Sequence, residues 1–187
     1  MNTERKETEP QAAYSNYYPV IAPLIMADGV GDGKTTACVM AQAATIDALR
    51  KGLTLDRPTD EMECCCPILR RMAIRANDTG WWASNEERTE FLRPLIPLLL
   101  DSRGSKSVID RRVFLIADQV VRVLTPIRLE WIGRKEDEEN IETLRNLSPI
   151  TDLATALAAR EVCSKFRAYA SAYASAYAYA SAYASAY

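Results

Sequence analysis

Histidine is absent from the 187 residues of the chain. Histidine titrates nearest neutral pH of all side chains, and it is the usual base for a serine or cysteine nucleophile and a common zinc ligand. Without it, acid–base chemistry would have to use carboxylates or lysine. The acidic residues Glu86, Glu87 and Glu90 and the run 136–139 lie in polar segments typical of solvated helix faces. We therefore assign no catalytic residue and expect a protein that is not an enzyme.

A strong charge of either sign is also missing. The net charge is −2 with 26% of residues charged, which provides neither the basic surface that nucleic acids need nor an acidic scaffold for cations. The N-terminal sequence MNTERKETEPQ is polar, and the short apolar run at 20–27 is broken by Pro23, so this end does not resemble a secretory signal. Three of the five cysteines are adjacent, a poor start for a disulfide framework. We expect a cytoplasmic protein with reduced thiols, no cofactor, no metal and no nucleic-acid partner.

Tyrosine is missing from the middle of the chain. Three of the nine tyrosines lie near the N-terminus, and the other six lie in the last 20 residues, which are the decapeptide AYASAYASAY written twice. This distribution predicts three regions. They are a polar arm with a glycine-rich loop at 1–33, one helical core domain at 34–167, and a low-complexity Ala/Tyr/Ser tail at 168–187.

The spacing of the tail places its aromatic rings on one side of a helix. At about 100° per residue, the six tyrosines share a face about 160° wide, with the serines opposite. They are Tyr169, Tyr173, Tyr177, Tyr179, Tyr183 and Tyr187. A strand stays open as an alternative because alanine would line one side of it, although alanine favours helices. A frayed tail stays open too, as does a repeat expansion without selected function. A membrane span is disfavoured because Tyr, Ala and Ser drive insertion weakly.

The first half of the chain contains two clear helical segments. Segment 35–51 has apolar residues at helical spacing, a threonine available as N-cap, and Gly52 beyond its end. The next segment begins at Pro67, in the favoured first position, and stops between 77 and 80. We expect Ile68, Leu69, Met72 and Ile74 to face mostly inward.

Capping residues and prolines divide the second half. Ser84 and Glu87 form a capping box before a leucine-rich helix that prolines at 94 and 97 should kink or split. Ser105 caps a helix that runs through Leu124. A further short helix follows from 125 to 133, and we expect the pair to form a hairpin. The apolar face of the longer helix comprises Val108, Ile109, Ile116, Val120, Val121 and Leu124.

The last predicted helix opens at Pro149 and meets no breaker before the tail. Its predicted inward face, with Ile150, Leu153 and Leu157, is rotated away from the tyrosine face, so the tail should project or meet a different surface. These elements predict an all-α fold, an irregular bundle of about six helices with a long C-terminal Ala/Tyr/Ser helix.

A glycine-rich stretch, LIMADGVGDGKTTA, has the order of a phosphate-binding loop. Its candidate phosphate-binding residues are Gly31, Gly33, Lys34 and Thr35. A Walker A loop needs glycine where this chain has Asp28, and no parallel sheet is predicted for the loop to top. A flexible loop before a helix is therefore the favoured interpretation. The alternative is a nucleotide-binding switch or enzyme that uses the Gly29–Thr36 loop.

Two further groups could carry function. Cys64, Cys65 and Cys66 precede a helix whose dipole could lower a thiol pKa, so redox or metal sensing is a second alternative to a role as buried small hydrophobes. Trp81 and Trp82 could form a ligand platform or cover the core.

Several segments appear in a characteristic order. They are ECCCPILRR, an Asn-Asp pair, LRPLIPLLL, an Arg-Arg pair and LRNLSPITD, followed by an Ala-rich tail. This order resembles that of a group of functionally uncharacterised bacterial and phage proteins with a C-x-C-P-[VI]-L segment and an Ala-rich helical C-terminus, over roughly residues 35–187. The resemblance implies a helical fold and tail, and no activity. The tail departs from the group because it lacks Arg and Trp.

The tail is the most specific feature of the sequence. Six rings at helical spacing bury apolar area while their hydroxyls stay available for hydrogen bonds. We therefore expect a helical interaction or assembly protein that binds itself or a protein partner through the tyrosine face.

Overall fold

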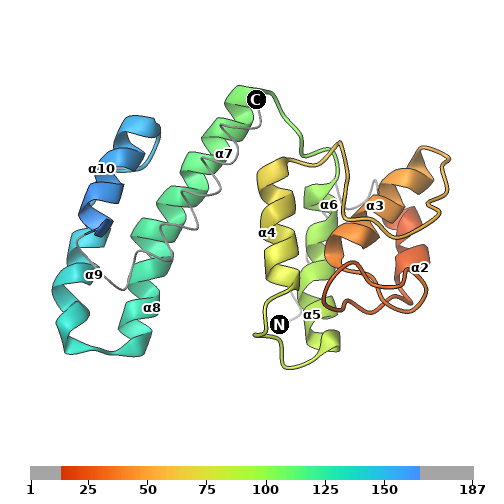
Figure 1. Ribbon diagram of the computed structural model, residues 1–187, viewed down its shortest axis with the longest axis horizontal. Coiled ribbons are helices and arrows are strands. Elements are labelled where there is room, and N and C mark those ends of the chain that lie inside the picture. Colours follow the sequence, from red (N-terminus) through yellow and green to blue (C-terminus); the bar gives the residue numbers. More distant parts are fainter. Residues whose placement is uncertain (1–13, 165–187) are drawn as a thin grey trace, which may run out of the picture. The chain divides into compact units, whose positions relative to one another are not determined.

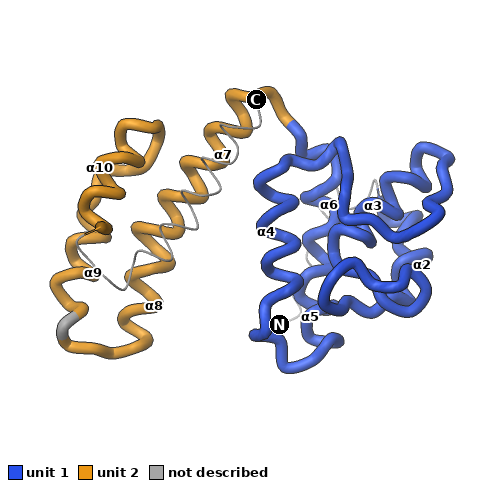
Figure 2. The backbone as a smooth tube through the Cα atoms, viewed as in Figure 1, with its two compact units in different colours: residues 1–103 blue, residues 104–187 orange. Residues whose placement is uncertain are grey.

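The computed structural model describes residues 14–164 (Figure 1). The regular elements in this part of the chain are helical, and an isolated parallel bridge joins Ile25 to Thr36. The predicted all-α class is confirmed. The chain divides into two compact units, residues 1–103 (unit 1) and 104–187 (unit 2), which Figure 2 shows in different colours. The range predicted as one core, 34–167, is thus divided after residue 103, and residues 14–33 belong to unit 1.

Unit 1 packs its helices around α3. Its elements are η1 (Ser15–Tyr17), α2 (Tyr18–Ile21), α3 (Val39–Arg50), α4 (Pro67–Asn77), α5 (Asn85–Leu92), η2 (Arg93–Leu95) and α6 (Ile96–Leu99). Helix α3 is buried along most of its length, and its many alanines allow α4 and α6 to approach closely.

Helix α3 begins later than the sequence predicts. It starts at Val39 rather than near Thr35, because Cys38 is the N-cap and its Sγ accepts a hydrogen bond from the Ala41 N–H at 3.3 Å. The backbone before Cys38 bonds to another segment instead of entering the helix. The Ala37 N–H donates to the Ile25 carbonyl, and Thr36 forms the bridge with Ile25. Lys34 and Thr35 therefore do not lie at a helix N-terminus.

The other boundaries in unit 1 follow the predicted signals. Helix α4 starts at Pro67 and ends at Asn77, although Met72 is exposed rather than inward. The Ser84 hydroxyl accepts from the Glu87 N–H at 3.2 Å, as in a capping box, and the Glu87 carboxylate accepts in return from the N–H of Ala83, the residue before the cap, at 2.7 Å. The prolines split the following segment into α5, the 3₁₀ turn η2 and α6.

Unit 2 is built on one long helical segment. Its elements are α7 (Lys106–Asp118), the π-helical turn η3 (Gln119–Leu124), α8 (Thr125–Ile132), η4 (Lys135–Asp137), α9 (Glu138–Arg145) and α10 (Leu153–Ser164). The predicted Ser105 cap and the stop at Gly133 are both present, with Gly133 at φ 72°.

The predicted hairpin between the two helices of 105–133 is wrong. The backbone stays right-handed helical from Asp118 through Thr125, so α7, η3 and α8 are continuous (Figure 1). Pro126 has no N–H to donate, and the Thr125 N–H and hydroxyl both bond to the Val120 carbonyl, which widens the turn without ending the helix. The predicted apolar face is only partly buried, since Ile109 and Val121 are inside while Val108 and Leu124 are exposed.

The last described helix also differs from its prediction. It begins at Leu153 rather than Pro149, because the Asp152 carboxylate accepts from the Thr155 N–H at 2.8 Å and marks the start. Ile150 is buried but precedes the helix, so Leu153 and Leu157 do not continue its face and are exposed. Ala159 and Cys163 form the buried side instead. The predicted continuation through 168–187 lies outside the described residues.

Within the described part of the chain, none of the helices combines the length and the apolar character that a bilayer crossing needs.

Candidate functional site

The glycine-rich loop is closed around the carboxylate of Asp32. The backbone N–H groups of Lys34, Thr35 and Thr36 donate to Asp32 Oδ1 at 2.9, 2.9 and 2.8 Å, and the hydroxyls of both threonines donate to the same carboxylate. The hydrogen bonds from Thr36, Lys34 and Thr35 hold the pKa of Asp32 well below its usual range. A phosphate bound at these N–H groups would have to displace Asp32 first.

The loop also depends on its glycines. Gly31 has φ 84°, and a Cβ there would lie 2.4 Å from the Thr36 carbonyl oxygen. Gly33 has φ 69° and lies against Pro58. The four predicted phosphate-binding residues, Gly31, Gly33, Lys34 and Thr35, therefore lie together in a loop whose donors are already used internally.

Asp28, which departs from the Walker pattern, anchors the loop to α5. Its Oδ1 lies 2.7 Å from Nη2 of Arg88, whose side chain is buried, and Nε and Nη1 of Arg88 have no partner among the described residues. The Asp78 carboxylate accepts from the Gly29 N–H at 3.0 Å, and the Thr89 hydroxyl accepts from the Met26 N–H at 2.7 Å. The sequence offered no signal for these long-range partners.

The three adjacent cysteines lie in different environments. Cys65 and Cys66 are buried, whereas Cys64 is half-buried. Burial raises the pKa of the Cys64 and Cys65 thiols above the ordinary value. The Cys66 N–H donates to the Ser102 hydroxyl at 2.9 Å. Across residues 14–164, His, Cys, Asp and Glu side chains do not gather into a group of three that could hold a metal.

The two adjacent tryptophans have separate surroundings. The indole N–H of Trp82 donates to the Ala76 carbonyl at 2.8 Å, and its ring lies 5.4 Å from that of Phe91. Trp81 is 86% exposed. They do not form one aromatic platform.

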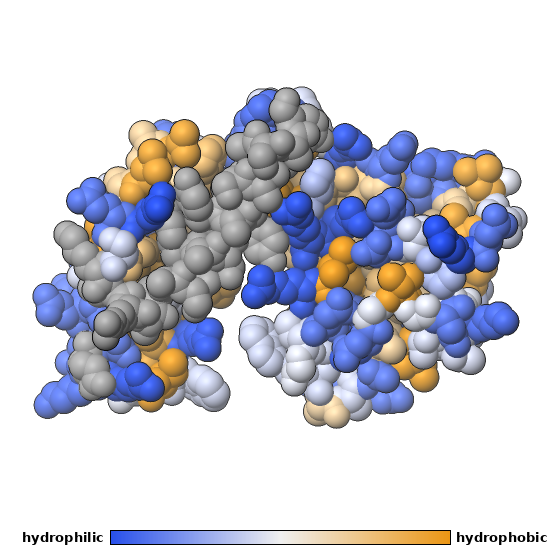
Figure 3. All heavy atoms as spheres, in the orientation of Figure 1, coloured by the Kyte–Doolittle hydropathy of each residue, from blue (hydrophilic) through white to orange (hydrophobic). Residues whose placement is uncertain are grey.

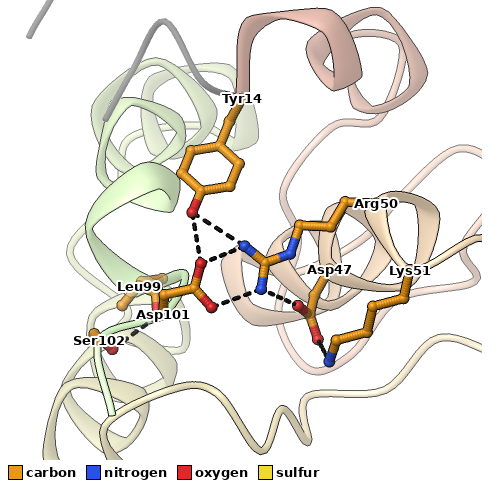
Figure 4. Close-up of polar contacts among 7 residues, drawn as sticks. All are labelled: Tyr14, Asp47, Arg50, Lys51, Leu99, Asp101 and Ser102. Carbon is orange, nitrogen blue, oxygen red and sulfur yellow. Dashed lines mark hydrogen bonds and ion pairs between the residues drawn. The ribbon is translucent and has the colours of Figure 1, made fainter. Parts of the chain in front are cut away.

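A charged cluster that the sequence did not suggest joins three distant segments of unit 1 (Figure 4). Arg50, at the end of α3, pairs through both terminal nitrogens with the Asp101 carboxylate and contacts Asp47 at 2.9 Å. The Tyr14 hydroxyl donates to Asp101 at 2.8 Å, and Lys51 lies 2.6 Å from Asp47. We call these five residues the Arg50 cluster.

The Arg50 cluster is arranged to stabilise the fold. The Arg50 guanidinium lowers the pKa of Asp101 to about 2. Burial, with the hydrogen bond to Asp101, raises the pKa of the Tyr14 hydroxyl. Asp101 holds φ 52°, a left-handed conformation that a side chain adopts only when its surroundings support it. The charges are mutually paired, and the cluster ties residue 14 to the ends of α3 and α6.

Unit 2 presents an apolar strip on the outside of the long helix where η3 passes into α8. Leu124, the last residue of η3, and Ile127 and Trp131 of α8 are 57%, 52% and 87% exposed. Their spacing of three and then four residues places them within about 60° on a helix. We call these three residues the α8 ridge. Figure 3 shows apolar side chains of both units among the hydrophilic atoms of the face in view.

Neither a protein-family model, a curated protein nor a solved structure matches the chain. The resemblance to bacterial and phage proteins with an Ala-rich tail stays a prediction. The six tail tyrosines, Tyr169 to Tyr187, lie outside the described residues.

Proposed function

We propose that the protein is a non-enzymatic helical assembly protein that self-associates through the tyrosine face of residues 168–187. The observation that carries this proposal is the α8 ridge. Three large apolar side chains at helix-pairing spacing are mostly exposed in a unit whose own core is small. Burying apolar surface contributes roughly 25 cal/mol per Å², so such a strip favours association.

The core of unit 2 supports the same conclusion. Its cluster of buried apolar residues comprises Val121, Leu129, Leu144, Ile150, Ala159 and Cys163. Two of these six side chains are small, so they supply limited burial for a unit of this length. Small helical domains commonly gain the missing stability from oligomerisation.

The two alternatives lack an observation of comparable weight. For a nucleotide-dependent function, a ligand would have to break five hydrogen bonds to Asp32 before it reached the loop. For thiol sensing, a raised pKa disfavours the reactive thiolate of Cys64 and Cys65. The free state of the five cysteines supports a reducing, cytoplasmic location for the assembly protein.

Sedimentation of the full chain tests the proposal. We expect particles of at least twice 20.9 kDa at micromolar concentrations. The matched control replaces all six tail tyrosines by serine, which keeps the length and the hydroxyls and removes the rings. This variant should sediment as a monomer. A wild-type chain that stays monomeric throughout the micromolar range would contradict the proposal.

A further inference from the structure

The α8 ridge has the pattern of a helix-pairing seam. Leu124, Ile127 and Trp131 follow the spacing i, i+3, i+7, and the half-buried Val120 lies four residues before Leu124 within η3. Apolar residues in this spacing form the contact strip of paired helices. In the described part of the chain, however, the three side chains of the ridge remain exposed.

The ridge faces away from the core of its own unit. Taking Leu124 as zero on α8, the buried residues Leu129 and Pro126 lie near 140° and 200°, opposite the ridge. The buried side of α10, Ala159 and Cys163, belongs to the same core cluster as Leu129. Helix α10 therefore packs on the core side of the unit, not on the ridge.

The charged residues of α8 nearest the ridge are Arg128 and Glu130. On a helix with Leu124 at zero, Arg128 lies about 40° away and is exposed. Both carboxylate oxygens of Glu130 lie 2.7 Å from nitrogens of Arg145. A charged partner segment would lose hydration on docking against the apolar side chains, whereas an uncharged, aromatic segment can pack on them and place a ring over the Arg128 guanidinium.

The tail has the matching chemistry and length. Residues 168–187 are uncharged, and each decapeptide carries three tyrosines at spacings of four. On a helix, three such rings span about 12 Å, whereas Leu124 to Trp131 span about 10 Å. Tyrosine rings pack well against tryptophan and leucine and keep their hydroxyls in contact with water.

We infer that the α8 ridge of one copy is the surface that binds the tyrosine face of residues 168–187 of a second copy. This inference rests on the proposed self-association and names its contact surface. A reciprocal exchange, in which each copy donates its tail to the ridge of the other, closes the assembly as a symmetric dimer.

The first test compares two equally exposed tryptophans in the full chain. Trp131→Ala should weaken self-association at least tenfold in sedimentation. Trp81→Ala, which removes a side chain of nearly equal exposure from unit 1, should change it less than twofold. Circular dichroism checks that each variant is folded. If Trp131→Ala does not fold, Ile127→Ser serves as the ridge variant in its place.

A mixing experiment identifies the contact. The variant with six tail serines has an intact ridge, and Trp131→Ala has an intact tail, so each alone should be monomeric. Their mixture should form a heterodimer that is weaker than the wild-type dimer, because one contact replaces two. Tail-to-tail or ridge-to-ridge contact gives no heterodimer, which would overturn the inference.

The outcomes separate the two proposals. A wild-type chain that associates equally with or without Trp131 overturns the inference and leaves self-association standing. A monomeric wild-type chain removes the proposed function itself. A monomer whose Trp131 is shielded from acrylamide quenching would place the tail on its own ridge, and this also overturns the inference.

Discussion

Unit 1 and unit 2 are both helical but use apolar side chains in opposite ways. In unit 1 sixteen buried apolar residues form one cluster around α3, and partly buried tyrosines and Trp82 pack against this cluster. In unit 2 six residues form the cluster, while the long helix carries large apolar side chains on its outside. The difference suggests that unit 1 is complete by itself, and that unit 2 gains its remaining stability from a contact.

The largest effect is expected in the core of unit 1. Ile46→Ala removes a fully buried side chain from α3 and should lower the free energy of unfolding by about 2–5 kcal/mol. Hydrogen exchange should locate the lost protection in residues 14–103. The control Leu115→Ala, on an exposed position of α7, should cost less than about 0.5 kcal/mol. An equal loss of protection in both units would show that they do not unfold independently.

The next effect compares two glycines of the loop in unit 1. Gly31→Ala should cost about 3 kcal/mol, because it combines a positive φ with a Cβ placed 2.4 Å from the Thr36 carbonyl. Gly29→Ala has a similar φ of 66° but no neighbouring atom within 4 Å, so it should cost about 1 kcal/mol. Thermal unfolding measures both. Equal losses would mean that the loop is not held tightly against Thr36.

Protein concentration should distinguish the two units directly. If self-association as a dimer covers unit 2, each tenfold rise in concentration above the dissociation constant should stabilise that unit by about 0.7 kcal/mol and leave unit 1 unchanged, because the fraction of free monomer falls only as the square root of the concentration. Hydrogen exchange at two concentrations measures this. The variant with six tail serines provides the control, since it should show no dependence in either unit. If raising the wild-type concentration stabilised unit 1 alone, the association surface would lie in unit 1 rather than in unit 2.

The sequence predicted elements whose signals are local. Pro67, Ser84, Ser105 and Gly133 mark helix ends through their own backbone and side-chain chemistry, and all four do so in the structure. The start of α3 was missed because Asp32 bonds the N–H groups that a helix would have used. That competition is also local, and an aspartate three residues before a threonine pair is a signal that could have indicated it.

Other features depend on contacts that no local pattern contains. Tyr14, Arg50 and Asp101 meet across separations of 36 and 51 residues. The α8 ridge was missed for a different reason. The long helix has apolar residues on two sides, so periodicity alone could not show which side the small core of unit 2 would bury.

The smallest expected effect is the loss of stability of unit 1 at acidic pH. Both units contain an arginine that grips a carboxylate with two nitrogens, Arg50 with Asp101 and Arg145 with Glu130, but only the first is reinforced by Tyr14. The pKa of Asp101 is about 2, below the unfolded value of about 3.9. Its stabilisation is therefore complete above about pH 5 and is lost progressively as the pH falls toward 2.

Because Asp101 is half exposed, this contribution should amount to only about 0.5–1 kcal/mol. Denaturant unfolding of Asp101→Asn and wild type between pH 5 and 2 measures it, and the two curves should converge as the pH falls. Asp32 also has a lowered pKa, so both proteins will keep a shared acid sensitivity in unit 1. The decisive quantity is the difference between them: parallel curves would mean that the Arg50 cluster does not stabilise unit 1, and the contrast with the exposed pair of unit 2 would disappear.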